Sequence, residues 1–304
     1  MTTAIQPARR ALGWRAELGL GTISLVWGST FILVKQALAD VSPLLFVALR
    51  FTLAAAVLAV LFRNRHAPSH TSRAGELRAG FVVGICLFGG YATQTIGLQY
   101  TTASKAGFIT CLYIVLVPAL SAALFRRIPQ ASEVIGIAAA GVGLALMTLP
   151  KGRFTIGAGD LLILACAFLY AIHIVVLDHY SKRVAFTRLS LYQIATTAVL
   201  ALATCWWMET PRIRWSLPVL WALAVTSLLA TALAFSVQTW AQQHTSATRA
   251  AVIFSLESVF AWLTAYLLAG EVLSRRAMWG GALILAGILS VELKPFSRPA
   301  HPSS

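Results

Sequence analysis

Glu257 is the residue of this sequence whose position most clearly points to chemistry, because it is an acid near the middle of a long apolar stretch. Residues 247–268 read as one helix, and at about 1.5 Å per residue Glu257 lies about 15 Å from its start. That depth is near the middle of an apolar layer about 30 Å thick. An ionisable group there is costly and is a functional candidate by default, able to bind a proton. The alternative is a structural carboxyl that is hydrogen-bonded or paired with Arg50.

Arg50 and His173 are the other ionisable groups of interest inside apolar stretches. Arg50 lies about 9 Å from the start of the stretch 44–62, where its guanidinium could hold a carboxylate through two parallel hydrogen bonds. Pairing with Glu257 and capping of backbone carbonyls are equally open. His173 fits a proton relay less well than a lone hydrogen-bonded histidine. No His-Glu-x-x-His pattern accompanies it, so no metal and no cofactor are expected.

The composition describes the medium in which these groups lie. Hydrophobic residues make up 58% of the 304 positions and charged residues only 11%, whereas about 25% of a soluble domain is charged. Ten mostly apolar stretches, each long enough to cross a bilayer as a helix, cover residues 18–37, 44–62, 79–98, 103–124, 131–149, 159–177, 189–208, 217–240, 247–268 and 277–293. The sequence therefore predicts an all-α polytopic membrane protein with ten transmembrane helices.

The net charge of +14 is distributed over the short connections between these stretches. Pairs such as Arg126–Arg127 and Lys182–Arg183 stand in loops, which is the pattern of membrane proteins and not of nucleic-acid binders. The loops on the side of both termini hold nearly twice as many Lys and Arg as those on the other side. Because basic loops stay in the cytoplasm, we expect a multi-pass protein of the cytoplasmic membrane, with both termini in the cytoplasm and no nucleic-acid partner.

An internal repeat relates the two halves of the chain. The segment Gln94–Ile109 (QTIGLQYTTASKAGFI) aligns with Gln238–Ile253 (QTWAQQHTSATRAAVI) at an offset of 144 residues, with seven of sixteen positions identical. Two glutamines, two threonines and the basic pair Lys105/Arg249 match in register, which unrelated apolar helices would not do. The chain is therefore a duplication of five helices.

Five crossings place the second copy upside down relative to the first, so the copies are inverted repeats. Inverted repeats recur in secondary transporters, whose substrate site lies near the midplane. We therefore interpret the chain as a transporter; a duplicated scaffold without a pathway is the alternative. The sequence has no G-x-x-x-x-G-K-[ST] motif, so ATP is not the expected driver. The competing function is an integral membrane enzyme with a Glu257/His173 site, but such scattered groups argue against an enzyme.

The repeats divide the chain into five parts. We expect a cytoplasmic N-terminal tail at residues 1–17, the first repeat at 18–149, a linker at 150–158, the second repeat at 159–293 and a cytoplasmic C-terminal tail at 294–304. As repeat mates, Lys105 and Arg249 would lie at opposite membrane faces, where they would fix orientation or guard the two mouths. Four charged residues at span ends have no expected role in transport: Lys35, Asp160, Asp178 and Glu271.

Three motifs stand out along the chain: Trp27-Gly28-Ser29-Thr30-Phe31 with Lys35, Pro43 and Arg50; Ala103–Ile109 with Pro118; and Thr248–Glu257 with Gly270-Glu271. They resemble the opening, the fourth helix and the ninth helix of the EamA-type proteins of the drug/metabolite transporter superfamily. The similarity covers about residues 18–292. It implies two inverted five-helix repeats that move small metabolites, often outward, with amino acids and related compounds as the leading substrates. Ser258 stands where the family often has proline, which questions a proline-induced break in the ninth helix.

The resemblance also implies a central cavity between helices one, three, four, six, eight and nine. An alternating-access transporter would hold its small-molecule substrate there. We expect seven side chains to contact the substrate: Trp27, Ser29, Arg50, Gln94, Tyr113, Gln238 and Glu257. Glu257 would also couple transport to a proton. The small-residue faces Ala139-x-x-x-Gly143 and Ala282-x-x-x-Ala286 fit close helix packing, within the protomer or in a homodimer.

Overall fold

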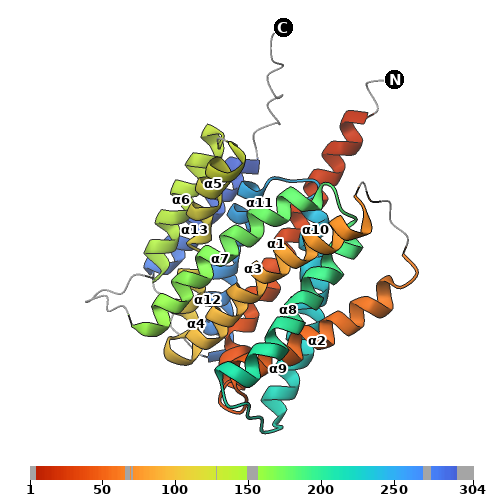
Figure 1. The fold of residues 1–304 in the computed structure, drawn as a ribbon. Helices are drawn as coiled ribbons and strands as arrows, with labels where there is room; N and C mark the ends of the chain where they lie inside the picture. Colours follow the sequence, from red (N-terminus) through yellow and green to blue (C-terminus); the bar gives the residue numbers. More distant parts are fainter. Residues whose placement is uncertain are drawn as a thin grey trace.

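The apolar stretches predicted from the sequence form helices in the computed structural model, which describes residues 5–65, 69, 71–127, 129–148, 157–269 and 275–292. The helices pack side by side into a bundle (Figure 1). In chain order they are α1 (Ile5–Ala37), α2 (Pro43–Phe62), α3 (Arg73–Tyr100), α4 (Ala103–Thr110), α5 (Tyr113–Phe125), α6 (Ala131–Thr148), α7 (Ala158–Ser181), α8 (Phe186–Met208), α9 (Leu217–Ser227), η1 (Leu228–Leu233), α10 (Ala234–Ala241), α11 (Ala247–Phe254), α12 (Leu256–Ala269) and α13 (Arg275–Glu292).

The prediction of an all-α polytopic membrane protein is confirmed. Within the described residues, seven helical stretches are long and apolar enough to cross a membrane, and two shorter apolar helices lie at 131–146 and 278–290. Two boundaries were predicted too late. Helix α1 begins at Ile5 rather than at 18, and α3 begins at Arg73 rather than at 79, because polar residues extend these helices beyond the apolar part. Most of the linker and the whole C-terminal tail fall outside the described residues, whereas residues 5–17 of the expected N-terminal tail are helical and belong to α1.

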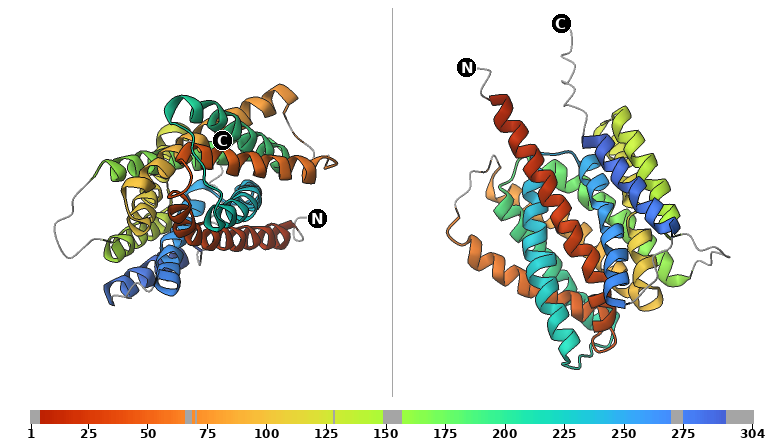
Figure 2. Two further views of the ribbon diagram at one scale, coloured as in Figure 1. Left: turned by 90° about the horizontal axis from the view of Figure 1, so that it is seen from below. Right: turned by 180° about the vertical axis from the view of Figure 1, so that it is seen from behind.

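Exposed tryptophans mark the ends of the bundle. Trp206, Trp207, Trp215 and Trp221 are each at least 60% exposed, and they lie at the end of α8 and the start of α9, opposite the end at which α1 begins (Figure 2). Trp14 is exposed near the other end, on α1. Amphipathic indole rings favour the level of the lipid headgroups, so these residues indicate the depth at which the bundle sits.

Two of the expected spans are each interrupted at corresponding positions. Helix α4 gives way to α5 at Cys111 and Leu112, and α11 gives way to α12 at Ser255. The question raised by Ser258 is thereby answered, because the ninth span breaks without a proline. The hydroxyls of Ser255 and Ser258 donate to the carbonyls of Val252 (2.6 Å) and Ser255 (2.8 Å), which adds a second hydrogen bond to carbonyls that accept a backbone N–H three residues on at the break.

The starts of α4 and α11 are also alike. The hydroxyl of Thr102 accepts from the N–H of Lys105 at 3.2 Å, and that of Ser246 accepts from the N–H of Arg249 at 3.2 Å. Both are N-caps, which satisfy free N–H groups of the first helical turn. In Figure 1, α4 lies at the end of the bundle opposite to α11.

A loop contact outside the membrane spans fixes the start of α2. Val41 and Ile213 form an isolated antiparallel bridge, and the Glu209 carboxylate accepts from the N–H of Leu45 at 2.8 Å in the first turn of α2. Asp40 accepts from the Ser216 hydroxyl at 2.6 Å. This bond, together with Arg214, holds the pKa of Asp40 below its usual value. The contact ties α2 to the segment between α8 and α9.

Helices α6 and α13 pack against each other through glycine. A Cβ at Gly143 would collide with the carbonyl oxygen of Gly280, and a Cβ at Gly287 would lie 2.7 Å from that of Gly136. The two contacts are related by the same offset of 144 residues. The small-residue face around Gly143 is thus used within the chain.

We expect Gly143→Val to destabilise the protein by about 1–3 kcal/mol, because overpacking forces the two helices apart. Gly141→Val on the same helix is the matched control, since a Cβ there meets nothing within 4 Å. Thermal unfolding of both variants in detergent measures the difference. Equal melting temperatures would contradict the close approach of α6 and α13.

Candidate functional site

A narrow cavity of about 60 Å³ lies at the centre of the bundle. Its wall is made of side chains from α1, α2, α3, α5, α7, α10, α11 and α12, which include the six spans expected from the resemblance and, through Arg50, the second span. The lining consists of the aromatic residues Trp27, Phe31, Tyr91, Tyr113, Tyr170, Phe235 and Phe254, the polar residues Thr30, Arg50, Gln94, Thr95, His173, Gln238 and Glu257, and the aliphatic residues Val34, Leu98 and Ile174.

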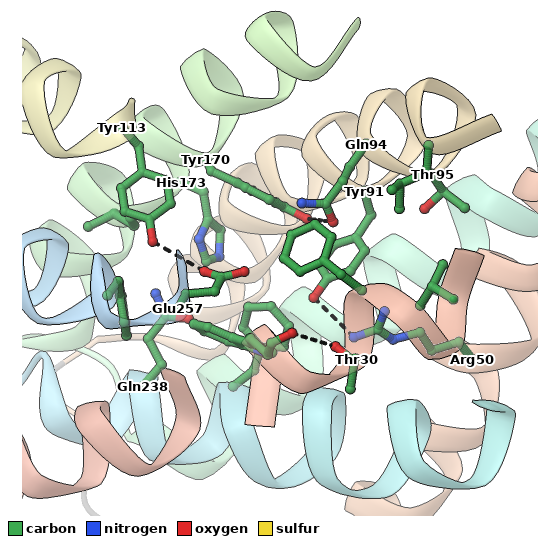
Figure 3. Close-up of a pocket in the computed structure, with 17 residues that line it drawn as sticks. Thr30, Arg50, Tyr91, Gln94, Thr95, Tyr113, Tyr170, His173, Gln238 and Glu257 are labelled. Carbon is green, nitrogen blue, oxygen red and sulfur yellow. Dashed lines mark hydrogen bonds between the residues drawn. The ribbon is translucent and has the colours of Figure 1, made fainter. Parts of the chain in front are cut away.

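Glu257 enters the cavity from the first turn of α12 and is 6% exposed. Its carboxylate accepts a hydrogen bond from the Tyr113 hydroxyl at 3.2 Å (Figure 3). A Cβ at Gly28 would lie 2.5 Å from the Glu257 carbonyl oxygen, so glycine on α1 allows α12 to come this close. The carboxyl is therefore held by one donor and has further acceptor capacity facing the cavity.

Arg50 lies at the other side of the cavity and does not pair with Glu257 (Figure 3). Its Nε donates to the Thr231 hydroxyl at 2.7 Å, and one terminal nitrogen donates to the Tyr91 hydroxyl at 3.1 Å and the Ala230 carbonyl at 3.2 Å. The guanidinium also lies 4.6 Å from the centre of the Tyr91 ring, an attractive cation–π contact. Within the described part of the chain, no carboxylate forms an ion pair with Arg50.

The π-helical segment η1 supplies two of these acceptors. Its wider turn replaces regular backbone bonds, and the Ala230 carbonyl receives the indole N–H of Trp27 at 2.8 Å as well as Arg50. Short π-helical segments are frequent at functional sites. Here η1 brings an oxygen-rich piece of backbone to a buried cation.

Aromatic rings fill the space around both charged groups. Trp27 lies 5.4 Å from Phe235 and 5.2 Å from Phe254 between ring centres, and Tyr91 packs edge-on against Tyr170 at 5.5 Å. Trp27 thus forms part of the apolar wall of the cavity.

Two glutamines that are repeat mates line the cavity, and they differ in how many of their side-chain polar atoms have a hydrogen-bond partner. Gln94 donates to the Thr110 hydroxyl at 3.3 Å and accepts from the Tyr170 hydroxyl at 3.2 Å. Gln238 donates to Gln242 at 3.1 Å, but its own side-chain oxygen is buried without a hydrogen-bond partner. An unpaired buried oxygen is costly, so Gln238 offers an acceptor for a ligand.

Ser29 is the expected site residue that does not line the cavity. Its hydroxyl donates to the Val26 carbonyl at 2.9 Å on its own helix, and the next residue, Thr30, lines the cavity instead. His173 does face the cavity, and its Nε2 lies 2.9 Å from the Gln193 side-chain oxygen. This matches the lone hydrogen-bonded histidine favoured from the sequence, with no contact to Glu257.

Sequence reasoning missed Tyr91, Tyr170 and Thr231, which complete the surroundings of Arg50 and Gln94. No local motif marks them, because their roles depend on helices far apart in the chain. Among the described residues, no group of three His, Cys, Asp or Glu side chains is close enough to hold a metal ion.

Gln193 and Gln238 provide a stability test of this network. Gln193 also donates to the Thr239 hydroxyl at 2.9 Å, so Gln193→Leu leaves buried His173 without its partner and removes the donor to Thr239, whose hydroxyl keeps its own bond to the Phe235 carbonyl. Gln238→Leu removes an oxygen that has no partner and one donated bond, to Gln242. We expect Gln193→Leu to cost about 1–3 kcal/mol more than Gln238→Leu, measured by thermal unfolding in detergent. A larger loss for Gln238→Leu would contradict the assigned hydrogen bonds.

Comparison with known proteins places the chain among transporters. An uncharacterized transporter of Archaeoglobus fulgidus is 35% identical over 92% of this chain and 86% of its own length. The uncharacterized transporter YoaV of Bacillus subtilis is 24% identical over 93% of this chain and 98% of its own length. One crystal structure shares the fold with a TM-score of 0.76 at 22% identity, covering 92% of this chain and 96% of that one.

These names indicate a membrane transporter rather than an enzyme. The model of the EamA-like transporter family matches the chain twice, over residues 14–149 and 157–293. Together these segments cover nearly the whole chain, including the residues that line the cavity. The protein belongs to the EamA-like transporter family.

Proposed function

We propose that this protein is a secondary transporter that moves small carboxylate-bearing metabolites, such as amino acids or related compounds, out of the cell by alternating access. The observation that carries the proposal is the central cavity, with Arg50 at one side, Glu257 at the other and aromatic rings between them. An amphipathic zwitterion fits this arrangement. A carboxylate would meet the guanidinium, an ammonium would meet the carboxylate, and an apolar side chain would pack on Trp27 and Phe254.

We infer further that the two halves are inverted repeats related by a two-fold axis in the membrane plane. The reciprocal contacts of Gly143 and Gly287 support this relation, since residues that exchange places under a two-fold make paired contacts. The repeat mates Tyr113 and Glu257 touch each other, which suits a position beside the axis. Helices α4 and α11 lie at opposite ends (Figure 1), which favours an inverted over a parallel arrangement.

Two ion pairs between the halves would serve as gates. Lys105 on α4 bonds Asp160 on α7 at 2.5 Å, and Arg249 on α11 bonds Glu17 on α1 at 3.4 Å. Each pair joins a residue of one half to a residue of the other, and the pairs lie at opposite ends of the bundle. Asp160, which was expected to have no role in transport, would thereby form part of a gate.

We propose that the protein lies in the cytoplasmic membrane. The distribution of basic residues predicts that both termini are in the cytoplasm. A reporter fused to the C-terminus that is active only in the cytoplasm tests this orientation. The start of α1 and the end of α13 lie at the same end of the bundle, which supports this proposal (Figure 1).

The substrate class is tested by uptake into proteoliposomes. A panel of labelled amino acids and amphipathic cations, with and without a pH gradient, should show transport of the zwitterions and none of the cations. Transport of cations alone would overturn the assignment of Arg50 to a substrate carboxylate.

We expect Glu257→Gln to abolish pH-gradient-driven uptake, because the amide cannot carry a proton across the membrane. The variant should fold, since its amide oxygen can still accept the Tyr113 hydrogen bond. Exchange of labelled for unlabelled substrate should survive, because exchange requires no net proton movement. Full gradient-driven transport by a stable Glu257→Gln protein would remove the proton-coupling role.

Glu257→Leu is the informative companion variant. If Glu257 were only structural, this change would leave the Tyr113 hydroxyl without its acceptor and lower thermal stability, while Glu257→Gln would keep most transport. Arg50 would keep its bonds to Thr231, Ala230 and Tyr91 in both variants. The two variants therefore separate a proton carrier from a packing residue.

We expect Lys105→Gln and Arg249→Gln to open the cavity to opposite sides of the membrane. Labelling of Thr30→Cys, in a background free of other cysteines, by a membrane-impermeant maleimide reports the side of access. Lys105→Gln should increase labelling by several-fold from the side of α4, and Arg249→Gln from the side of α11. Each variant is the control for the other, and the same pattern in both would contradict the gate assignment.

A further inference from the structure

A second cavity, of about 140 Å³, lies between the C-terminal ends of α5 and α7, away from the central cavity. It is lined by the charged or titratable side chains of Arg127, Asp178, His179, Lys182 and Arg183, and by Ser121, Phe125 and Val175. None of these residues lines the central cavity, so the proposed transport of a small metabolite does not account for this second cavity.

The charges of this cavity leave it positive. Asp178 is its buried acid and binds both Arg127 (2.9 Å) and Lys182 (2.7 Å). It thereby holds two cations side by side, and each keeps N–H donors that Asp178 does not use. Arg183 forms no ion pair with an acid in the described part of the chain. Three cationic groups around one carboxylate leave an excess of two positive charges.

The depth of the cavity indicates what kind of anion it meets. Two membrane-spanning stretches end at its rim, at Phe125 and at Ser181. Leu124 is 56% exposed and Phe125 37% exposed beside it, so its flank faces the acyl chains. The phosphate groups of a bilayer lie just beyond the hydrocarbon core. Basic pockets between helices on the cytoplasmic side are typical binding sites for anionic headgroups.

We propose that this cavity binds a phosphate group, that of an anionic phospholipid such as phosphatidylglycerol. Arg127 and Arg183 would donate paired N–H groups to the phosphate oxygens, and Lys182 would add a point charge. The apolar side chains of Leu124 and Phe125 would contact the glycerol and upper acyl carbons. Phe125 stacks on His179 with ring centres 4.7 Å apart. This stacked pair would form the wall between the phosphate and the acyl carbons.

The test is lipid binding by the detergent-solubilised full chain, followed by native mass spectrometry during titration with phosphatidylglycerol or phosphatidylcholine. Wild-type protein should retain phosphatidylglycerol in preference to phosphatidylcholine. The double variant Lys182→Gln/Arg183→Gln should bind phosphatidylglycerol about thirtyfold more weakly, as expected when two basic residues at a lipid surface are removed.

The matched control is Arg73→Gln/Arg78→Gln, which removes two exposed basic residues from the same end of the bundle, outside the cavity. Its affinity for phosphatidylglycerol should remain close to that of the wild type. Equal losses in the two double variants, or no preference for phosphatidylglycerol in the wild type, would overturn the proposal. If the first variant does not fold, Arg183→Gln alone, which breaks no ion pair with a described acid, should show about a fivefold loss.

Inorganic phosphate distinguishes the source of the group. Stabilisation of the wild type by millimolar phosphate, lost in Lys182→Gln/Arg183→Gln, would support the phosphate site with the free ion as its ligand. Stabilisation by phosphatidylglycerol without any effect of phosphate would support the lipid headgroup. No difference between the variant and wild type with either ligand would overturn the site.

Discussion

The structure is organised by the need to keep a permanent positive charge inside an apolar layer. An arginine does not lose its proton in a protein, so Arg50 must find hydrogen-bond acceptors at its depth or face lipid at a cost of about 2.5–3.5 kcal/mol on the insertion scale. Its hydrogen-bond acceptors come from two separate elements: Thr231 and Ala230 on η1, and Tyr91 on α3. The π-helical turn and the position of α3 bring these acceptors to Arg50. Glu209 anchors the start of α2, the helix that carries Arg50.

The interrupted spans connect the centre of the protein to its two ends. Each of α4 and α11 is only eight residues long, about 12 Å. A basic residue in the first turn of each helix joins the opposite half, and beyond the break the next helix brings Tyr113 or Glu257 into the cavity. A displacement of one short helix would therefore act on an ion pair at one end of the bundle and on the Tyr113–Glu257 contact together.

Much of the fold could be predicted from the sequence because hydrophobic length and the internal offset are local or periodic signals. The positions of the spans and the correspondence of Tyr113 with Glu257 both follow from counting along the sequence. The partners of Arg50 did not, because a carbonyl released by a π turn leaves no periodic trace in Leu228–Leu233. The exclusion of Ser29 from the cavity and the inclusion of Thr30 depend on a rotation of α1 that spacing alone does not define.

The small volume of the cavity adds a constraint on how a substrate could occupy it. A space of about 60 Å³ holds a few water molecules, and a metabolite of amino-acid size needs more. The wall of the cavity contains few aliphatic side chains that could move aside without breaking a hydrogen bond. Its polar side chains Arg50, Gln94 and Tyr113 are all engaged in hydrogen bonds. A substrate must therefore replace some of these bonds as the wall moves apart. The unpaired oxygen of Gln238 and the remaining acceptor capacity of Glu257 are the groups that gain a bond at that moment. A solute with N–H donors close to a carboxylate can compensate for the bonds that are lost, whereas an apolar solute of the same size cannot.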